Sequence, residues 1–207
     1  MQGDAEHIGV WGRTKSGKTT LTKTLIKGRS RVVIFDPMGE YEGVQVEALP
    51  AMVEAIADRW GGSFQVAYRP PDFGDPVAHL DAFAEIVRAV QKPYQLGEES
   101  RSLTVVVDEL AMTFPNVRRA SSAFGGLCSR GRHYGIELIG TSQRMADVGT
   151  VFRGNTSCDY FLPLRAAVDV GAATDLIGRE HVAALRALQN HEYLCFKGGE
   201  LTRGKNF

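Results

Sequence analysis

Short runs of apolar, mostly β-branched residues alternate along the chain with segments in which apolar residues recur every three or four positions. The first pattern is typical of buried strands, and the second of helices that pack one face against a sheet. The runs predict strands at residues 7–11, 31–36, 64–68, 103–108, 136–141, 159–164 and 192–197. The periodic segments predict helices at residues 18–26, 51–60, 76–90, 121–130, 168–177 and 181–188. Because strands and helices alternate, we expect an α/β fold with a mainly parallel sheet.

Length and composition narrow the class of protein. A chain of 207 residues suits one globular domain, which we expect to fill residues 1–207. Its polar tail at 198–207 is expected either to fray or to reach a neighbouring subunit. No apolar run approaches the roughly 18 residues of a membrane span, so we expect no such span of its own. The three cysteines lack a paired spacing, which favours a reducing, cytoplasmic compartment.

The net charge neither indicates nor excludes a nucleic-acid partner. Lys and Arg together number 24, as do Asp and Glu, so the formal net charge is zero. The chain therefore lacks the overall positive electrostatic field that would indicate DNA binding. A ring of subunits could still gather a few arginines in its pore while the rest of the surface stays neutral.

Residues 12–19 match the phosphate-binding pattern G-x-x-x-x-G-K-[ST] between the first predicted strand and the first predicted helix. The glycines let successive backbone N–H groups point at phosphates, and the helix N-terminus adds partial positive charge. Lys18 is expected to reach the β- and γ-phosphates, and the Thr19 hydroxyl to ligate Mg²⁺. The sequence therefore predicts a bound nucleoside triphosphate. The expected contacts are Gly12, Arg13, Thr14, Lys15, Ser16, Gly17, Lys18, Thr19 and Thr20.

A second motif follows an apolar run. Residues 103–109 read Leu-Thr-Val-Val-Val-Asp-Glu, the pattern of a Walker B strand. Asp108 at the end of the strand is expected to hold Mg²⁺ together with Thr19. Glu109 would then lie beside the γ-phosphate, where it can orient or deprotonate the attacking water.

A third polar segment ends the next predicted strand. Residues 141–144 read Thr-Ser-Gln-Arg, and ligands gather at the carboxyl ends of parallel strands. Gln143 is therefore expected to sense the γ-phosphate or to position the water. Arg130 and Arg132 lie just upstream, where solvated arginines that complement a helix C-terminus are an alternative interpretation.

Together these motifs resemble those of the FtsK–HerA superfamily of DNA-pumping ATPases, over residues 8–164. The Asp-Pro-Met-Gly-Glu-Tyr segment at 36–41 is similar to that of HerA-like helicases. The Arg-Gly-Arg-His-Tyr-Gly-Ile segment at 130–136 and the Thr-Ser-Gln-Arg segment are similar to those of FtsK and conjugative coupling ATPases. Asp36 and Glu40 would either support the Mg²⁺ site or form a structural turn. One departure is Met145, which follows Gln-Arg where FtsK-like proteins usually have proline.

The resemblance implies a RecA/FtsK-like three-layer sandwich that hydrolyses ATP with Mg²⁺ and assembles as a hexameric ring. It also implies an arginine finger that completes a neighbour's site. Arg132, three residues before Gly135, is the best positional match, and Arg130 is the second.

A motor core of this length without extra domains resembles the genome-packaging ATPases of tailless, internal-membrane viruses with double-jelly-roll capsids. The implied function is translocation of double-stranded DNA into a preformed capsid. Capsid or portal-vertex proteins would be partners, in the host cytoplasm or at the packaging vertex of the virion.

The DNA contact is expected from Arg118 and Arg119, which follow the Walker B motif and can grip phosphates without regard to sequence. A solvated loop is the competing interpretation. Rival functions are a HerA-like or conjugation-type DNA pump or helicase, a small-molecule kinase, and a nucleotide switch that does not hydrolyse. Glu109 and the Thr-Ser-Gln-Arg strand end favour water as the phosphoryl acceptor over a kinase substrate.

Overall fold

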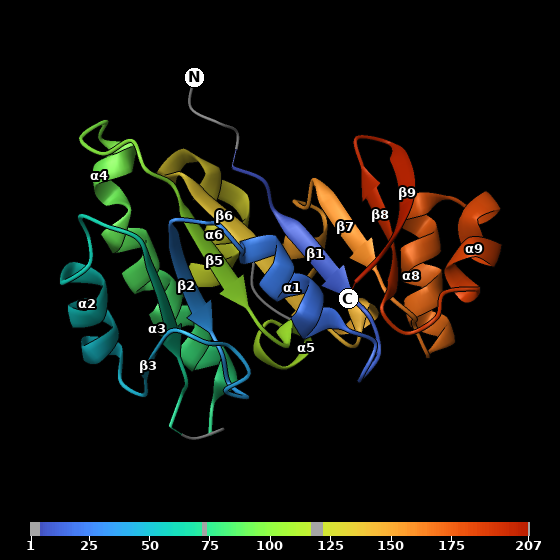
Figure 1. The fold of residues 1–207 in the computed structure, drawn as a ribbon, viewed down its shortest axis with the longest axis horizontal. Coiled ribbons are helices and arrows are strands. Elements are labelled where there is room, and N and C mark those ends of the chain that lie inside the picture. The colour runs from blue at the N-terminus through green and yellow to red at the C-terminus, as the bar shows by residue number, and fades with distance from the viewer. Residues whose placement is uncertain (1–4, 72–73, 117–121, 207) are drawn as a thin grey trace.

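A single sheet runs through the computed structural model, which describes residues 5–71, 74–116 and 122–206 (Figure 1). Its order among these residues is β3-β4-β2-β5-β6-β1-β7-β8-β9. The first seven strands pair in parallel, and β8 and β9 add an antiparallel edge. The strands are β1 (Ile8–Trp11), β2 (Arg31–Phe35), β3 (Val44–Val46), β4 (Phe64–Tyr68), β5 (Leu103–Val107), β6 (Ile136–Ser142), β7 (Cys158–Phe161), β8 (Glu192–Lys197) and β9 (Glu200–Lys205).

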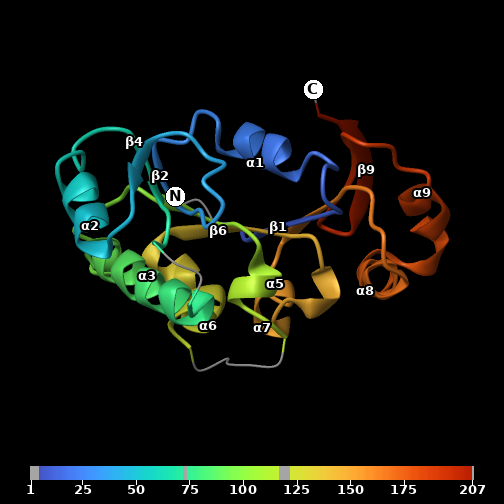
Figure 2. The same ribbon diagram turned by 90° about the horizontal axis from the view of Figure 1, so that it is seen from below.

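Helices cover both faces of the sheet, and Figure 2 shows α1 on one face with α3, α6 and α7 on the other. This arrangement confirms the predicted three-layer α/β fold. The α-helices are α1 (Lys18–Ile26), α2 (Leu49–Ala57), α3 (Pro76–Val90), α4 (Lys92–Gln95), α5 (Leu110–Thr113), α6 (Ala123–Arg130), α7 (Thr150–Arg153), α8 (Ala167–Ile177) and α9 (Val182–Arg186). Short 3₁₀ turns cover Gly131–Tyr134, Met145–Asp147 and Arg179–His181.

The two layers form because successive side chains of a strand point to opposite faces. In β2, Val32 and Ile34 belong to a core that includes residues of α1. Val33 and Phe35 belong to the other core, where the Phe35 ring meets Phe83 of α3 with centroids 5.4 Å apart. The central strands are therefore buried on both faces, which explains why they read as continuous apolar runs.

All seven predicted strands and all six predicted helices are present, and the differences lie at their ends. The strand predicted at 159–164 stops at Phe161, shortly before Pro163, whose missing N–H prevents it from donating to the ladder. The helix predicted at 121–130 begins at Ala123, because the Ser122 side chain accepts from the Gly125 N–H as an N-cap. The pattern missed β3 and the short helices α4, α5 and α7, which are too brief for periodicity to reveal.

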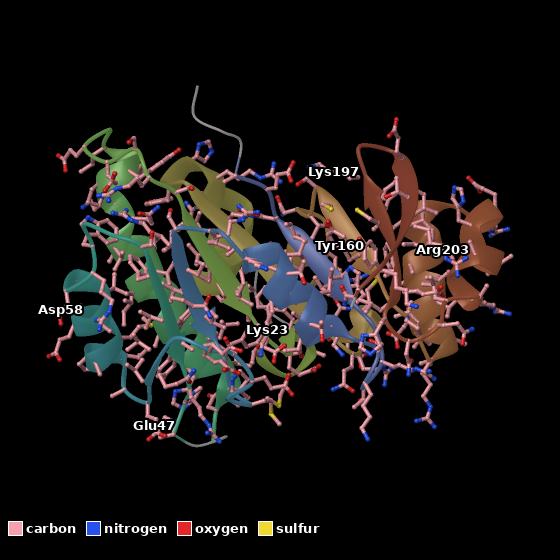
Figure 3. All side chains as sticks on the ribbon, viewed as in Figure 1. Lys23, Glu47, Asp58, Tyr160, Lys197 and Arg203 are labelled. Atoms are coloured by element: carbon pink, nitrogen blue, oxygen red, sulfur yellow. The ribbon has the colours of Figure 1, made fainter. Side chains whose placement is uncertain are left out.

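The expectation that the tail at 198–207 frays was wrong for its described residues, 198–206. Residues Glu200–Lys205 form β9, which pairs antiparallel with β8 through a tight turn at Gly198 and Gly199. Both glycines have positive φ, 60° and 84°, as tight hairpin turns favour. Figure 3 marks Lys197 and Arg203 on this hairpin and Tyr160 on the neighbouring β7.

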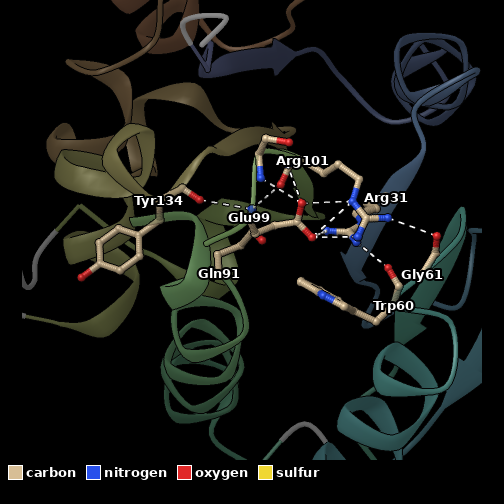
Figure 4. A network of polar contacts seen from close by, with 8 residues as sticks. Arg31, Trp60, Gly61, Gln91, Glu99, Arg101 and Tyr134 are labelled. Atoms are coloured by element: carbon tan, nitrogen blue, oxygen red, sulfur yellow. Dashed lines mark hydrogen bonds and ion pairs between the residues drawn. The ribbon is translucent and has the colours of Figure 1, made fainter. Parts of the chain in front are cut away.

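A charge network around the buried Arg31 side chain ties the amino end of β2 to the start of β5 (Figure 4). The Arg31 guanidinium lies 3.9 Å from the centroid of the Trp60 ring, and its Nη1 lies 3.3 Å from Oε2 of Glu99. Glu99 also accepts from the Arg101 side chain, with Nη2 at 2.8 Å. Hydrogen bonds from Arg101 lower the pKa of Glu99 to about 2, despite the opposing effect of desolvation.

Within residues 5–71, 74–116 and 122–206, every helix falls short of the length and apolar character that crossing a bilayer requires.

Glu99→Gln should destabilise the fold by about 2–3 kcal/mol at neutral pH, because it leaves the buried Arg31 charge without its counterion. The pKa of Glu99 is depressed, so its contribution is present above its unfolded pKa and is lost as the pH falls toward 2. Denaturant unfolding should therefore show the two proteins converging between about pH 4.5 and 2. Glu98→Gln, at an exposed neighbouring carboxylate, is the control and should change little. An equal loss in both variants would contradict this assignment.

Candidate functional site

The predicted phosphate loop joins β1 to α1 and is tied to the strands on either side. The Gly12 N–H donates to the Ser142 carbonyl at the end of β6 at 3.2 Å, and the Arg13 N–H donates to the Pro163 carbonyl at 2.9 Å. Gly17 has φ +104°, a backbone conformation that favours glycine, and α1 starts at the next residue. The loop therefore lies at the carboxyl edge of the sheet, with Thr19 and Thr20 in the first turn of α1.

Lys18 lies over this loop. Its Nζ donates to the carbonyl oxygens of Gly12 at 2.8 Å and of Arg13 at 3.2 Å. Burial lowers the pKa of Lys18, while the nearby carboxylates of Glu109, Asp108 and Glu40 oppose this shift. The ammonium group thus lies among carboxylates, where it can also meet phosphate oxygens.

Asp108 and Glu109 follow β5 and face the same loop. Asp108 is buried, and burial raises its pKa to about 6, although a hydrogen bond from the Thr141 hydroxyl opposes the shift. The Thr141 oxygen also accepts from the Glu109 N–H at 3.3 Å, so one β6 side chain positions both acids.

Gln143 connects the Glu109 carboxylate to the phosphate loop. Its Nε2 donates to Oε2 of Glu109 at 3.2 Å, and its Oε1 accepts from the Thr14 hydroxyl. The backbone N–H of Gln143 and the Ser142 hydroxyl both lie 3.4 Å from Oε1 of Glu109. Gln143 is therefore placed to transmit a change at the loop to Glu109.

In the segment after β2, at residues 36–41, the two acidic residues have different surroundings. Asp36 is fully buried and accepts from the N–H groups of Glu40 and Tyr41, both at 2.9 Å, so it holds a structural turn. That turn brings Glu40 to the site, where its Oε2 accepts from the Thr19 hydroxyl at 2.6 Å. From the sequence, a place for Glu40 beside the expected Mg²⁺ site was one of two alternatives. The sequence could not decide between them, because contact with Thr19 depends on the path of the turn.

The side chains of Lys18, Glu40, Asp108, Glu109 and Gln143 line one cavity of about 730 Å³. The Thr19 hydroxyl and the carboxylates of Glu40 and Asp108 are the hard oxygen ligands that suit Mg²⁺. The elevated pKa of Asp108 indicates a carboxylate that a nearby cation would stabilise. The lining residues are Thr14, Lys15, Gly17, Lys18, Thr19, Thr20, Met38, Glu40, Asp108, Glu109, Met112, Gln143 and His191.

Backbone strain is concentrated in this cavity. Among the described residues, positive φ in residues other than glycine occurs at Lys15 (62°), Glu109 (52°) and His191 (68°). All three line the cavity. Such conformations cost on the order of 1–3 kcal/mol each and persist where the surrounding structure imposes them, often at functional sites.

A second cavity, of about 810 Å³, lies beyond the Thr14–Gln143 contact. Its lining includes four cationic side chains, Arg13, Lys15, Arg144 and Arg165. Arg144 donates through Nε to the buried Asp169 carboxylate at 3.1 Å. The sequence pattern did not reveal this cluster, because its members come from three separate segments, with Arg13 and Lys15 both in the phosphate loop.

The predicted arginines lie elsewhere. Arg130 ends α6, and Arg132 lies in the 3₁₀ turn that precedes β6, at the amino edge of the sheet and opposite the cavity. Arg132 is exposed and donates to the Asn155 carbonyl at 2.9 Å. Neither arginine joins the site of its own chain. Arg118 and Arg119 lie outside the described residues.

Comparisons with known proteins place this geometry in context. The family model of the central domain of the helicase HerA matches residues 5–106. The genome packaging NTPase B204 from Sulfolobus turreted icosahedral virus 2, in complex with AMPPCP, is 19% identical, with a TM-score of 0.76 and a match over 99% of both chains. The DNA-packaging ATPase B204 from Sulfolobus turreted icosahedral virus is 17% identical, with a TM-score of 0.75 over 100% of both chains.

A further similar structure is VirB4 of Thermoanaerobacter pseudethanolicus, at 14% identity and a TM-score of 0.72. That match covers 97% of this chain and 89% of VirB4. A search of curated protein sequences finds no match.

The fold, with its phosphate loop and paired acids at the carboxyl edge of the sheet, is that of a P-loop NTPase. The family model and the structural matches confirm the resemblance that the motifs indicated. The chain is therefore similar to P-loop ATPases of the FtsK–HerA type.

Proposed function

We propose that this chain hydrolyses ATP with Mg²⁺ and uses the energy to translocate double-stranded DNA, as a subunit of a hexameric ring that packages a viral genome into a preformed capsid. The observation that carries the proposal is the convergence of Lys18, Glu109 and Gln143 in one cavity. The matches to two packaging ATPases over nearly the full length of the chain support the viral role.

In this proposal the loop N–H groups and Lys18 bind the triphosphate, while Thr19 and Asp108 hold Mg²⁺ with support from Glu40. The metal would neutralise charge on the phosphate oxygens when bound. Glu109 orients the attacking water and accepts its proton. Gln143 holds Glu109 by a 3.2 Å hydrogen bond and responds to the loop through Thr14.

Arg132 is proposed as the finger that completes a neighbour's site, with Arg130 as the second candidate. Both are exposed and lie at the sheet edge opposite their own cavity, so only another copy of the chain could bring such an arginine to the nucleotide. Fingers of this kind contribute about 10³–10⁵ in rate in other P-loop enzymes.

Arg118 and Arg119 remain the proposed DNA contacts, and capsid or portal proteins the proposed partners, in the host cytoplasm or at the packaging vertex. A conjugation-type or HerA-like DNA pump is the second candidate, favoured by the likeness to VirB4 and by the HerA family model. A kinase is less favoured, because Glu109 and Gln143 lie together beside the phosphate loop, where they favour water as the phosphoryl acceptor.

The test is ATP hydrolysis by the purified protein with and without long double-stranded DNA, at low and moderate salt. We expect DNA to stimulate turnover, and the stimulation to fall with salt because phosphate contacts release counterions. Lys18→Ala is the control and should abolish turnover in every condition. Turnover that depends on Lys18 but ignores DNA in the presence of capsid as well would contradict translocation.

Glu109→Gln should keep nucleotide affinity close to that of the unmodified protein but lower turnover by about 10²–10⁴-fold, because it removes the general base and keeps the shape of the side chain. Equilibrium binding of ATP and steady-state hydrolysis measure the two effects separately. Glu98→Gln, at an exposed carboxylate that does not line the cavity, serves as the matched control. Undiminished turnover in Glu109→Gln would contradict the role of Glu109 as the general base and point to another base.

A further inference from the structure

We infer that His191 contacts the nucleoside part of the bound nucleotide, and that Asn206 positions His191 and the phosphate loop. This inference rests on the nucleotide binding of the proposed function, and it does not depend on DNA or on hydrolysis. Neither residue belongs to a nucleotide-binding motif, and both come from the C-terminal part of the chain, far in sequence from the loop.

The backbone of His191 is bonded directly to the phosphate loop. Its N–H donates to the Ser16 carbonyl at 2.8 Å, and its own carbonyl accepts from the Asn206 N–H at 2.7 Å. The Asn206 side chain is buried, and its Nδ2 donates to the Gly17 carbonyl at 2.9 Å. The residues that flank the β8–β9 hairpin thus hold two successive loop carbonyls, those of Ser16 and Gly17, and so fix the path of the loop backbone.

The His191 side chain lies over the loop as well. A Cβ added to Gly17 would come within 2.8 Å of the His191 Nδ1, so the ring packs against the loop backbone. The ring is exposed and lines the same cavity as Lys18 and Glu109. His191 also holds a left-handed φ of 68°, which it shares among non-glycine residues only with Lys15 and Glu109 in the described part of the chain.

The order of the sheet indicates which end of a nucleotide meets His191. Asp108, Glu109 and Gln143 follow β5 and β6, which lie on one side of β1. His191 precedes β8, which lies on the other side of β1, as Figure 1 shows. A triphosphate whose γ-phosphate meets Glu109 therefore runs along the loop toward His191, so its nucleoside end reaches the imidazole.

The chemistry of an exposed imidazole suits this position. Its face can stack on a purine base, and a ring nitrogen can hydrogen-bond a ribose hydroxyl. In the proposed function, Lys18 and the loop N–H groups bind the phosphates, so His191 is not required for phosphate binding. His191 is therefore assigned to recognition of the nucleoside, and Asn206 to positioning.

The experiment compares His191→Gly with the unmodified protein for two ligands, MgATP and magnesium tripolyphosphate, which has three phosphates and no nucleoside. Glycine adopts a φ of 68° freely, so this change removes the ring without disturbing the backbone hydrogen bonds. We expect MgATP affinity to fall by about tenfold, tripolyphosphate affinity to stay unchanged, and the melting temperature to stay the same or rise.

Two further variants separate recognition from positioning. Asn206→Ala should weaken both ligands by the same factor, because it acts through the loop. Gln189→Ala, an exposed residue of the same connection that does not line the cavity, is the control and should change neither affinity.

Unchanged MgATP affinity in His191→Gly, or an equal loss for both ligands, would overturn the assignment. If the unmodified protein bound neither ligand, the proposed function itself would fail, and that result is distinct from a failure of His191 alone.

Discussion

The parallel register of β5, β6 and β1 is the constraint on which the site depends. Val107, the last residue of β5, and Gly9 both pair with Gly140, while β1 and β6 continue together to the pair Trp11 and Ser142. Asp108 consequently meets Thr141, and the phosphate loop meets Ser142. A slip of one residue in β5 would turn Asp108 to the other face of the sheet and separate it from the loop.

The strained backbone conformations of the site lie next to these paired strands. Lys15, Glu109 and His191 all hold left-handed backbone conformations, and each is attached to an element whose own position is fixed by buried strands. Together these residues cost several kcal/mol on the usual scale, which is comparable to the net stability of a domain.

Contiguous motifs made the centre of the site predictable. The phosphate loop and the Asp108–Glu109 pair each lie in one stretch of sequence next to a strand, so their positions follow from the fold class. Contacts between distant segments were not predictable in this way. Glu40 reaches Thr19 only through the turn that Asp36 holds, and Asn206 reaches Gly17 only because residues 200–205 form a strand that the polar sequence did not indicate. The functional roles of the motif residues stay predictions until they are measured.

The most direct test of the central claim is calorimetric binding of a non-hydrolysable ATP analogue with and without Mg²⁺, in the unmodified protein and in Lys18→Ala. The account predicts saturable binding to one site per chain that weakens when Mg²⁺ is removed and is lost in Lys18→Ala, while the variant keeps its melting temperature. Binding of equal strength in both proteins, or no binding by the unmodified protein, would contradict it.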